Sequence, residues 1–452
     1  MSDVTGRLAR YMAEAREREL PAVAAREARH RILDTMAAMV SGAHLKPGGM
    51  AIKFARAQGG APEATVVTTD IRTNAVNAAL ANAMFGHADE TDDTHPPTLT
   101  HPGTSVVPAA MAIGERNRLP GGDVLRAIVL GYDVCARLLL SLQPMPFLRS
   151  GHHAGAFGQL FGAAAAAGSL LRLDARRVRY LLSYAAEQAS GLYTMFRDPE
   201  HVEKAYAMGG MPAQHGVAAA LMVASGFTGV EDAFSGERDF FHTFAPPEGA
   251  DPEVLARGLG KDYEIRRGGI KRWPVGGPIQ GPMHVLRDLM KEHDIRAGAV
   301  DRLIARLPDK ELEIVNNRPT PDICLQHLLA VMLQDGTVTF KSAHDFKRMR
   351  DPKILALRER IEAVGDPDLT DAQRRWRCVM EIRLKDGRTL NHQTMAAKGS
   401  FENPLTPEEE NEKALDLIEP VLGKARSQAL LKALWHFDEL KDVRALRRLY
   451  AA

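Results

Sequence analysis

Apolar residues recur at three- and four-residue spacing over most of the chain, and this pattern predicts a mainly helical protein. Two amphipathic helices are predicted near the N-terminus, over VTGRLARYMAEARERE and from Pro21 to Gly42, where proline suits a first turn and glycine a last one. Further helices are predicted near residues 76–86, 105–115, 122–140, 154–171, 176–192 and 211–226. Several of these runs are apolar on more than one face, so we expect them at the centre of a large bundle.

The hydrophobic period changes near Tyr263. VDRLIARL, TVTF from Thr337 and IEAVGDP from Ile361 alternate as strands do, and PDICLQHLLAVMLQDG between them is helical. RWRCVMEIRLKDGRTLNHQTM predicts a hairpin with Asp386-Gly387 at its turn. An earlier run, ATVVTTD, predicts a small hairpin arm or edge piece. Helical patterns return after Pro404, and Thr406 and Glu409 have the spacing of a capping box.

These elements predict a mainly α fold with two domains. We expect a large all-helical domain built from both chain ends, residues 1–265 and 403–452, and an inserted smaller α+β lid domain, residues 266–402. The length of 452 residues is sufficient for two or three separate cores.

The composition argues against two classes of binding partner, nucleic acids and membranes. A net charge of +1 argues against electrostatic capture of nucleic acid or of an anionic membrane, and basic and aromatic residues are not interleaved. The longest apolar tract, Gly155 to Leu171, is rich in glycine and alanine and favours a buried helix over a membrane span. The three cysteines are far apart, and the N-terminal helix lacks an apolar signal core. We therefore expect a cytoplasmic protein.

One polar stretch, HADETDDTHPPTLTHPG from His87 to Gly103, lies between two apolar helical runs and is stiffened by three prolines. Stiff polar loops at the ends of buried helices often hold functional groups. If the preceding helix continues through His87, Glu90 lies on the same face. A carboxylate, the hydroxyl of Thr94 and His101 could then line one cavity, and Asp93 is a further candidate for substrate binding.

Two other interpretations of this stretch remain open. Its histidines and carboxylates could bind a divalent ion, although no HExxH, EF-hand or paired-histidine helix spacing is present. Alternatively, its Asp and Thr residues could form an ordinary network of caps and turns.

Four further motifs carry candidate residues, and each also has an ordinary structural interpretation. In GHHAG, a histidine just before a helix could bind a ligand. It could instead cap the helix or pack in the core. The lysine in HVEKAYAMGGMPAQHG could be an exposed helix-end residue. GGIKRWPVGG could bind an anion through its backbone N–H groups and the side chains of its lysine and arginine. NNRPTPDICLQH has an arginine in a rigid turn, which could bind a carboxylate, and a histidine on a helix. The candidates are His152, Lys204, Lys271, Arg272, Arg318 and His327. GxGxxG, GxxxxGK[ST] and GxSxG motifs are absent, so nucleotide binding and a serine nucleophile are unsupported.

Taken together, these motifs resemble the MmgE/PrpD family, whose members include 2-methylcitrate dehydratase, cis-aconitate decarboxylase and iminodisuccinate epimerase. The resemblance runs nearly end to end, through HADETDDTHPPTLTHPG, HHAGAFGQLFGAAAAAGSLLRLD, MGGMPAQHG, IKRWP, NNRPTP and ENPLTPEE. It implies a helical domain and an α+β lid with the site between them, a homodimer, and neither a metal nor an organic cofactor. The family's site positions fall here on Glu90, Thr94, His101, His152, Lys204, Lys271 and His327.

The resemblance also implies the class of reaction, which stabilises a carbanion or enolate beside a carboxylate. We expect a cofactor-independent lyase, a hydratase or dehydratase acting on a small di- or tricarboxylate. His101 or His152 would transfer a proton, and Lys204 and Lys271 would hold substrate carboxylates. The decarboxylase branch has aspartate in place of Glu90 and tyrosine in place of His327. An isomerase or epimerase, a cis-aconitate-type decarboxylase, and a non-catalytic member that binds an anion or a partner are the alternatives.

Overall fold

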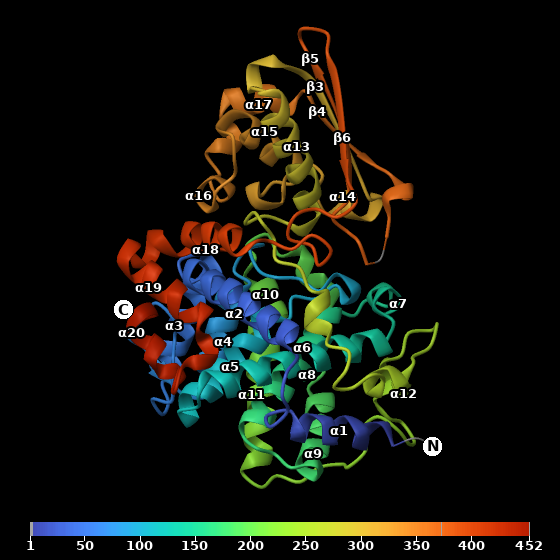
Figure 1. The fold of residues 1–452 in the computed structure, drawn as a ribbon. Coiled ribbons are helices and arrows are strands. Elements are labelled where there is room, and N and C mark those ends of the chain that lie inside the picture. Colours follow the sequence, from blue (N-terminus) through green and yellow to red (C-terminus); the bar gives the residue numbers. More distant parts are fainter. Residues whose placement is uncertain (1–2, 372, 452) are drawn as a thin grey trace. The chain divides into compact units, whose positions relative to one another are not determined.

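The computed structural model describes residues 3–371 and 373–451, and helices account for most of them, which confirms the predicted mainly α fold (Figure 1). Contacts divide the chain into two compact units. Unit 1 comprises Met1–Ala88, Asp92–Gly268 and Leu417–Ala452. Unit 2 comprises Asp89–Thr91 and Gly269–Asp416.

Unit 1 is built around long helices, and its central ones pack on each other through small residues. Helix α8 contacts α5, α6 and α11, and α4 contacts α5 and α11. Gly162 of α8 lies so close to Gly131 of α6 that an added Cβ would stand 2.6 Å from the Gly131 carbonyl oxygen. The helices up to residue 244 are α1 Val4–Glu14, α2 Ala22–Gly42, α3 Lys46–Gln58, α4 Ala75–Gly86, α5 Gly103–Asn117, α6 Gly121–Ser141, α7 Pro144–Arg149, α8 Ala154–Leu170, α9 Ala175–Glu187, α10 Val202–Ala205, α11 Met211–Ala224 and α12 Phe240–Phe244.

The predicted small hairpin is present in unit 1 as two short antiparallel strands, β1 Ala64–Thr65 and β2 Arg72–Thr73. The C-terminal helices are α18 Pro407–Leu422, α19 Lys424–Trp435 and α20 Arg447–Tyr450, and unit 1 takes α18 from Leu417 onward. The Glu115 carboxylate of α5 pairs with Arg447 and accepts a hydrogen bond from the Tyr450 hydroxyl, which fixes the C-terminal segment to α5.

Unit 2 contains a four-stranded sheet in the order β4-β3-β5-β6, with β3 parallel to β4 and antiparallel to β5. The strands are β3 Val300–Leu307, β4 Ile361–Gly365, β5 Cys378–Leu384 and β6 Thr389–Thr394, and the helices are α13 Gln280–His293, α14 Asp309–Val315, α15 Leu325–Asp335, α16 Phe340–Ala343 and α17 Pro352–Arg358. Side chains of α13, α15 and the sheet, such as Leu286, Leu329 and Ile382, form a hydrophobic core within this unit.

The local predictions for unit 2 are confirmed at several places and wrong at one. The β5–β6 hairpin turns at Asp386-Gly387, where Gly387 has φ +91°. Thr406 and Glu409 form the predicted capping box with reciprocal side-chain to backbone bonds of 3.3 and 2.9 Å. Strands also form at VDRLIARL and IEAVG.

TVTF is not a strand. Thr339 instead caps α16, because its side chain and that of Ser342 each bond the other residue's backbone N–H. Such local bonds compete with strand pairing, and alternation over four residues is too short to overrule them.

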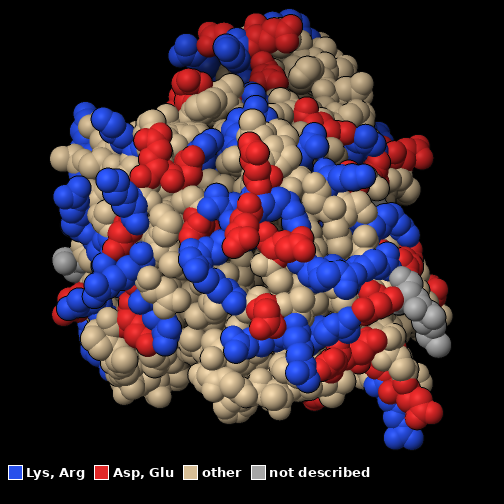
Figure 2. Space-filling view, turned by 60° about the horizontal axis from the view of Figure 1, so that its bottom comes forward, with Lys and Arg blue, Asp and Glu red and all other residues tan. Residues whose placement is uncertain are grey.

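No helix among the described residues is long and apolar enough to cross a membrane. On the face shown in Figure 2, Lys and Arg side chains are interspersed with Asp and Glu rather than gathered into a patch of one sign.

Candidate functional site

The polar stretch that begins at His87 is divided between the two units. Helix α4 ends at Gly86, in agreement with the predicted range of 76–86. His87 is its C-cap with φ −119° and ψ 32°, so the condition under which a continuing helix would place Glu90 on the face of His87 is not met. Asp89–Thr91 packs with unit 2, whereas Asp92 and the following residues pack with unit 1.

In unit 1, the loop from Asp92 to Pro102 is held by buried polar contacts. Asp93 accepts hydrogen bonds from the Tyr132 hydroxyl at 2.7 Å and the Gly103 N–H at 3.1 Å, and burial raises the pKa of its carboxyl to about 6. Thr94 donates its hydroxyl to the Thr100 carbonyl at 3.3 Å. Asp93 and Thr94 therefore form the turn network that the sequence left open as an alternative.

Gly103 is required where this loop meets α5. A Cβ there would lie 2.6 Å from the Asp93 carboxylate and 2.8 Å from the Tyr132 hydroxyl, so a side chain would displace the bonds that hold the loop.

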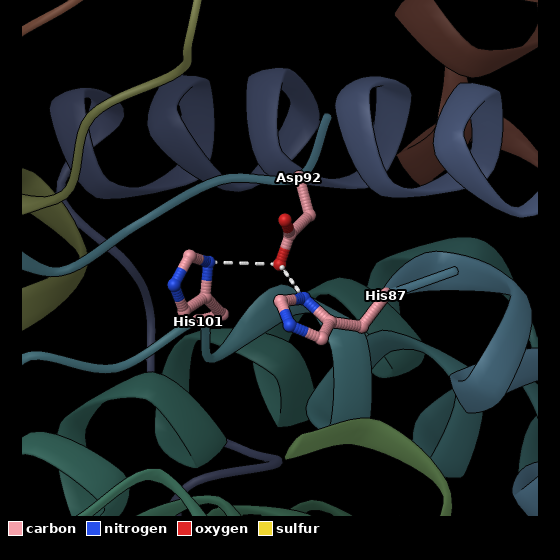
Figure 3. Close-up of side chains that lie close together, drawn as sticks. All are labelled: His87, Asp92 and His101. Atoms are coloured by element: carbon pink, nitrogen blue, oxygen red, sulfur yellow. Dashed lines mark hydrogen bonds and ion pairs between the residues drawn. The ribbon is translucent and has the colours of Figure 1, made fainter. Parts of the chain in front are cut away.

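Two histidines, one before this loop and one near its end, share one carboxylate oxygen (Figure 3). Asp92 Oδ2 lies 2.8 Å from His87 Nδ1 and 2.8 Å from His101 Nδ1. His101 Nδ1 also donates to the Asp93 carbonyl oxygen at 2.7 Å. The backbone of His101 is fixed in turn, because its N–H donates to the Gln159 side chain of α8 at 3.3 Å.

Three further basic side chains surround this group, and all six residues together are called the imidazole cluster. Its members are His87, Asp92, His101, His153, His201 and Lys204. The His87 ring lies 5.0 Å from the His101 ring and 5.3 Å from the His201 ring, measured between centroids. Lys204 Nζ stands 5.3 Å from the centroid of Phe196, and the ring of His153 is 5.7 Å from the same phenyl ring.

His153 is the N-cap of α8, and its Nδ1 accepts the Ala156 N–H at 3.2 Å. Burial lowers the pKa of His153 to about 3, and the neighbouring basic side chains of His87, His101 and Lys204 act in the same direction. Burial also lowers the pKa of His87, against the opposing effect of Asp92. These two imidazoles are therefore neutral at physiological pH, and Lys204 supplies positive charge to the cluster.

His152 lies elsewhere. Its ring stacks on Phe147 at 4.8 Å and meets Phe157 edge-on at 5.4 Å, and burial lowers its pKa. Of the two adjacent histidines, the structure brings His153 into the imidazole cluster. The N-cap position before α8 was the feature that could have distinguished them.

In unit 2, three cationic side chains hold the tripeptide Asp89–Thr91. Lys271 Nζ donates to the Glu90 carbonyl oxygen at 2.8 Å and lies 3.8 Å from its carboxylate. Lys413 Nζ donates to the Thr91 carbonyl oxygen at 2.9 Å, and His344 Nε2 lies 3.0 Å from Asp89 Oδ2. Glu90 and Lys271, 181 residues apart, are thus brought together, whereas His344 and Lys413 belong to no motif that the sequence singled out.

The remaining candidates are also in unit 2. The Arg272 side chain pairs with Glu409, and the backbone N–H of Arg272 donates to the Gln280 side chain. His327 is fully buried on α15, and burial, with the charge of Arg358, lowers its pKa to about 4. Arg318 has a buried Nε without a hydrogen-bond partner among the described residues.

One group in unit 1 has ligand types that a divalent metal could use. Nitrogen and oxygen atoms of His87, Asp92 and His101 lie within 4.8 Å of one another. The two contacts of 2.8 Å are also normal hydrogen-bond lengths, so hydrogen bonding alone accounts for the arrangement.

Comparison with known proteins shows which family models and relatives the chain matches. Residues 6–253 match the MmgE/PrpD N-terminal domain, and residues 273–437 match the MmgE/PrpD C-terminal domain. A cis-aconitate decarboxylase of Homo sapiens is 25% identical over 440 residues, covering 92% of this chain and 88% of that protein. A cis-aconitate decarboxylase of Aspergillus terreus is 23% identical over 492 residues, covering 99% and 96%. The cis-aconitate decarboxylase-like protein oryM of Aspergillus oryzae is 24% identical over 475 residues, covering 99% and 97%.

Proposed function

The chain belongs to the MmgE/PrpD family, and we propose that it is a cofactor-independent lyase that acts on a small di- or tricarboxylate through an enolate-type intermediate. The observation that carries this proposal is the imidazole cluster of unit 1, in which His87 and His101 contact the Asp92 carboxylate and His153, His201 and Lys204 lie near these two rings. Dehydration is the first candidate reaction.

The cluster has the groups that such a reaction requires. Removing a proton beside an ionised carboxylate builds a second negative charge, and a preorganised donor in a poorly hydrated site stabilises it by roughly 3–4 kcal/mol. Lys204 is the cationic member suited to that role. His101 is half-buried, with 16% of its side chain exposed, and is our candidate for proton transfer, which contributes about 10²–10⁴-fold in rate.

Unit 2 holds a separate set of candidate groups. The contact between Lys271 and Glu90 supports the proposal that they act together, with Lys271 binding a substrate carboxylate. Arg272, Arg318 and His327 stay candidates for substrate binding, and His152 stays a candidate for proton transfer. The homodimer and the cytoplasmic location also stay predictions.

Decarboxylation is the second candidate, because the curated relatives are cis-aconitate decarboxylases. Loss of CO₂ from such an acid also leaves a carbanion that must be stabilised and protonated. The same cluster therefore supports either reaction, and identities of 22–25% do not choose between them.

The proposal is tested by incubating the purified protein with citrate, 2-methylcitrate and cis-aconitate while measuring ultraviolet absorbance of unsaturated acids and release of CO₂. We expect turnover of at least one acid, unchanged after dialysis against EDTA, and loss of turnover in H101Q. Deuterium uptake from D₂O without loss of water or CO₂ would identify an isomerase instead. Absence of turnover on all three acids, with and without added Mg²⁺ or Zn²⁺, would contradict the proposal.

A further inference from the structure

The shared oxygen of Asp92 fixes which nitrogen of each neighbouring ring carries a proton. We propose that Asp92 is a positioning residue that keeps His101 and His87 protonated at Nδ1, and that His87 joins His101 as a second site residue offering a bare Nε2. This inference rests on the proposed function for its catalytic part and on geometry alone for its structural part.

The tautomer of His101 follows from what its Nδ1 faces. That nitrogen lies 2.7 Å from the Asp93 carbonyl oxygen, which can only accept, and 2.8 Å from Asp92 Oδ2. A bare nitrogen there would face the carbonyl oxygen without a hydrogen between them, so Nδ1 carries the hydrogen. The lone pair of the neutral ring is then on Nε2.

The tautomer of His87 follows from the sharing of the oxygen. A protonated Oδ2 could donate to only one of two nitrogens, whereas an ionised Oδ2 accepts from both at 2.8 Å. His87 therefore also carries its hydrogen on Nδ1.

The other nitrogen of His87 indicates a ligand. The side chain is fully buried, and its Nε2 has no hydrogen-bond partner among the described residues. Leaving a buried acceptor unsatisfied costs about 1–3 kcal/mol, so such a site usually has an occupant that donates. A hydroxyl of the substrate is the chemical group that fits, because it can donate to a bare ring nitrogen.

These assignments give Asp92 a defined part in proton transfer. When His101 Nε2 takes a proton from a substrate carbon, the C–H bond breaks, an N–H bond forms and the electron pair moves into the enolate. The ring becomes an imidazolium whose Nδ1–H still faces Asp92, so the carboxylate stabilises the charge as it forms.

The experiment measures tautomers directly, by ¹⁵N NMR of protein labelled at histidine, with H87Q and H101Q used to assign the two rings. The variants are Asp92→Asn, Asp92→Glu and the control Asp133→Asn, which removes another fully buried unit 1 carboxylate, one bonded to Tyr11 and the Glu264 N–H. In wild type, we expect both rings to carry hydrogen on Nδ1. In D92N, we expect at least one ring to change tautomer and kcat to fall about 100-fold or more with little change in KM.

The remaining variants separate positioning from folding. D92E should recover part of kcat, and D133N should lower the melting temperature while leaving both tautomers and kcat as in wild type. The wild-type spectrum tests the tautomers even if D92N does not fold.

A bare Nδ1 on either wild-type ring, or unchanged tautomers in D92N, would overturn the inference. So would a stoichiometric divalent metal in active wild-type protein that is lost in D92N, because the metal would occupy the position assigned to hydrogen. If the tautomers behave as expected but no polycarboxylate is turned over, the proposed function fails and the structural role of Asp92 stands.

Discussion

Two histidines, one in each unit, have pKa values shifted in opposite directions. His153 in the imidazole cluster is surrounded by other basic groups, and burial, with these groups acting in the same direction, lowers its pKa to about 3. Burial alone would also lower the pKa of His344, but its ion pair with Asp89 outweighs burial, and the pKa rises to about 9. At His344, the ion pair with Asp89 therefore decides that the imidazole is charged.

The raised pKa of His344 predicts a loss of stability at alkaline pH. A group whose folded pKa lies above its unfolded value of about 6.5 contributes stability that is complete below pH 6.5 and is lost as pH rises through 9. The difference corresponds to roughly 3 kcal/mol. We expect the free energy of unfolding of unit 2 to fall by an amount of this order between pH 6 and pH 9.5.

Tryptophan fluorescence can measure this change within unit 2, because Trp273 and Trp376 belong to it and W435F removes the third tryptophan. D89N should flatten the dependence between pH 6.5 and 9, whereas H436Q, at an exposed ion pair, should leave it unchanged. A slope that survives in D89N would show that another group causes it.

At single positions, the sequence could indicate residue types but not tertiary partners. The motif around His101 was found, and Glu90 and Lys271 do meet. The role of Asp92 could not be predicted. The polar stretch contains four carboxylates, and only the folded structure shows which of them contacts the two histidine rings.

Among elements, the long helices were predictable from their hydrophobic pattern, and some also from a capping residue, as in α4, where Asn74 accepts the Asn77 N–H. The end of α4 at Gly86 agrees with the run predicted near residues 76–86, but the path of the chain after it was not predictable, since the next residues contain no proline or glycine until Pro96. Close packing of helices, in contrast, follows from the glycine content of α6 and α8 and can be tested directly.

Gly162→Ala should destabilise unit 1. The new Cβ would stand 2.6 Å from the Gly131 carbonyl oxygen and 2.9 Å from Cys135 Cβ, so α6 and α8 would have to separate. Overpacking of this kind typically costs 1–3 kcal/mol, about the range we expect in urea unfolding followed by circular dichroism.

Gly49→Ala is the matched control, because Gly49 also lies within a helix, α3, and nothing lies within 4 Å of its Cβ position. That variant should be stabilised by about 0.5–1 kcal/mol, since alanine loses less backbone entropy on folding. Equal effects of the two substitutions would mean that helix propensity, and not the contact of α6 with α8, determines the result at Gly162.

At the scale of the whole molecule, the change from helical to alternating pattern near Tyr263 indicated where a different kind of domain begins. It could not indicate that Asp89–Thr91 packs with unit 2, because the residues on both sides of this tripeptide belong to unit 1. Unit 2 is thus one continuous segment, Gly269–Asp416, plus three residues from far upstream, and this composition has a measurable consequence.

Residues 269–416 produced alone should fold, because their hydrophobic core is built from residues of that segment. The fragment lacks Asp89, so the burial that lowers the pKa of His344 is no longer outweighed by that ion pair. We expect its pKa to fall from about 9 toward 6.5 or below, measured by ¹⁵N-histidine NMR titration with H344Q for assignment.

The control is full-length protein, in which His344 should titrate near pH 9. Within the fragment, Asp322 still raises the pKa of His344 by its charge. A value that stays near 9 would therefore show that this neighbour suffices and that the tripeptide contributes little. A low value would establish that three residues of the polar stretch set the charge of a histidine 255 positions away along the chain, counted from Asp89 to His344.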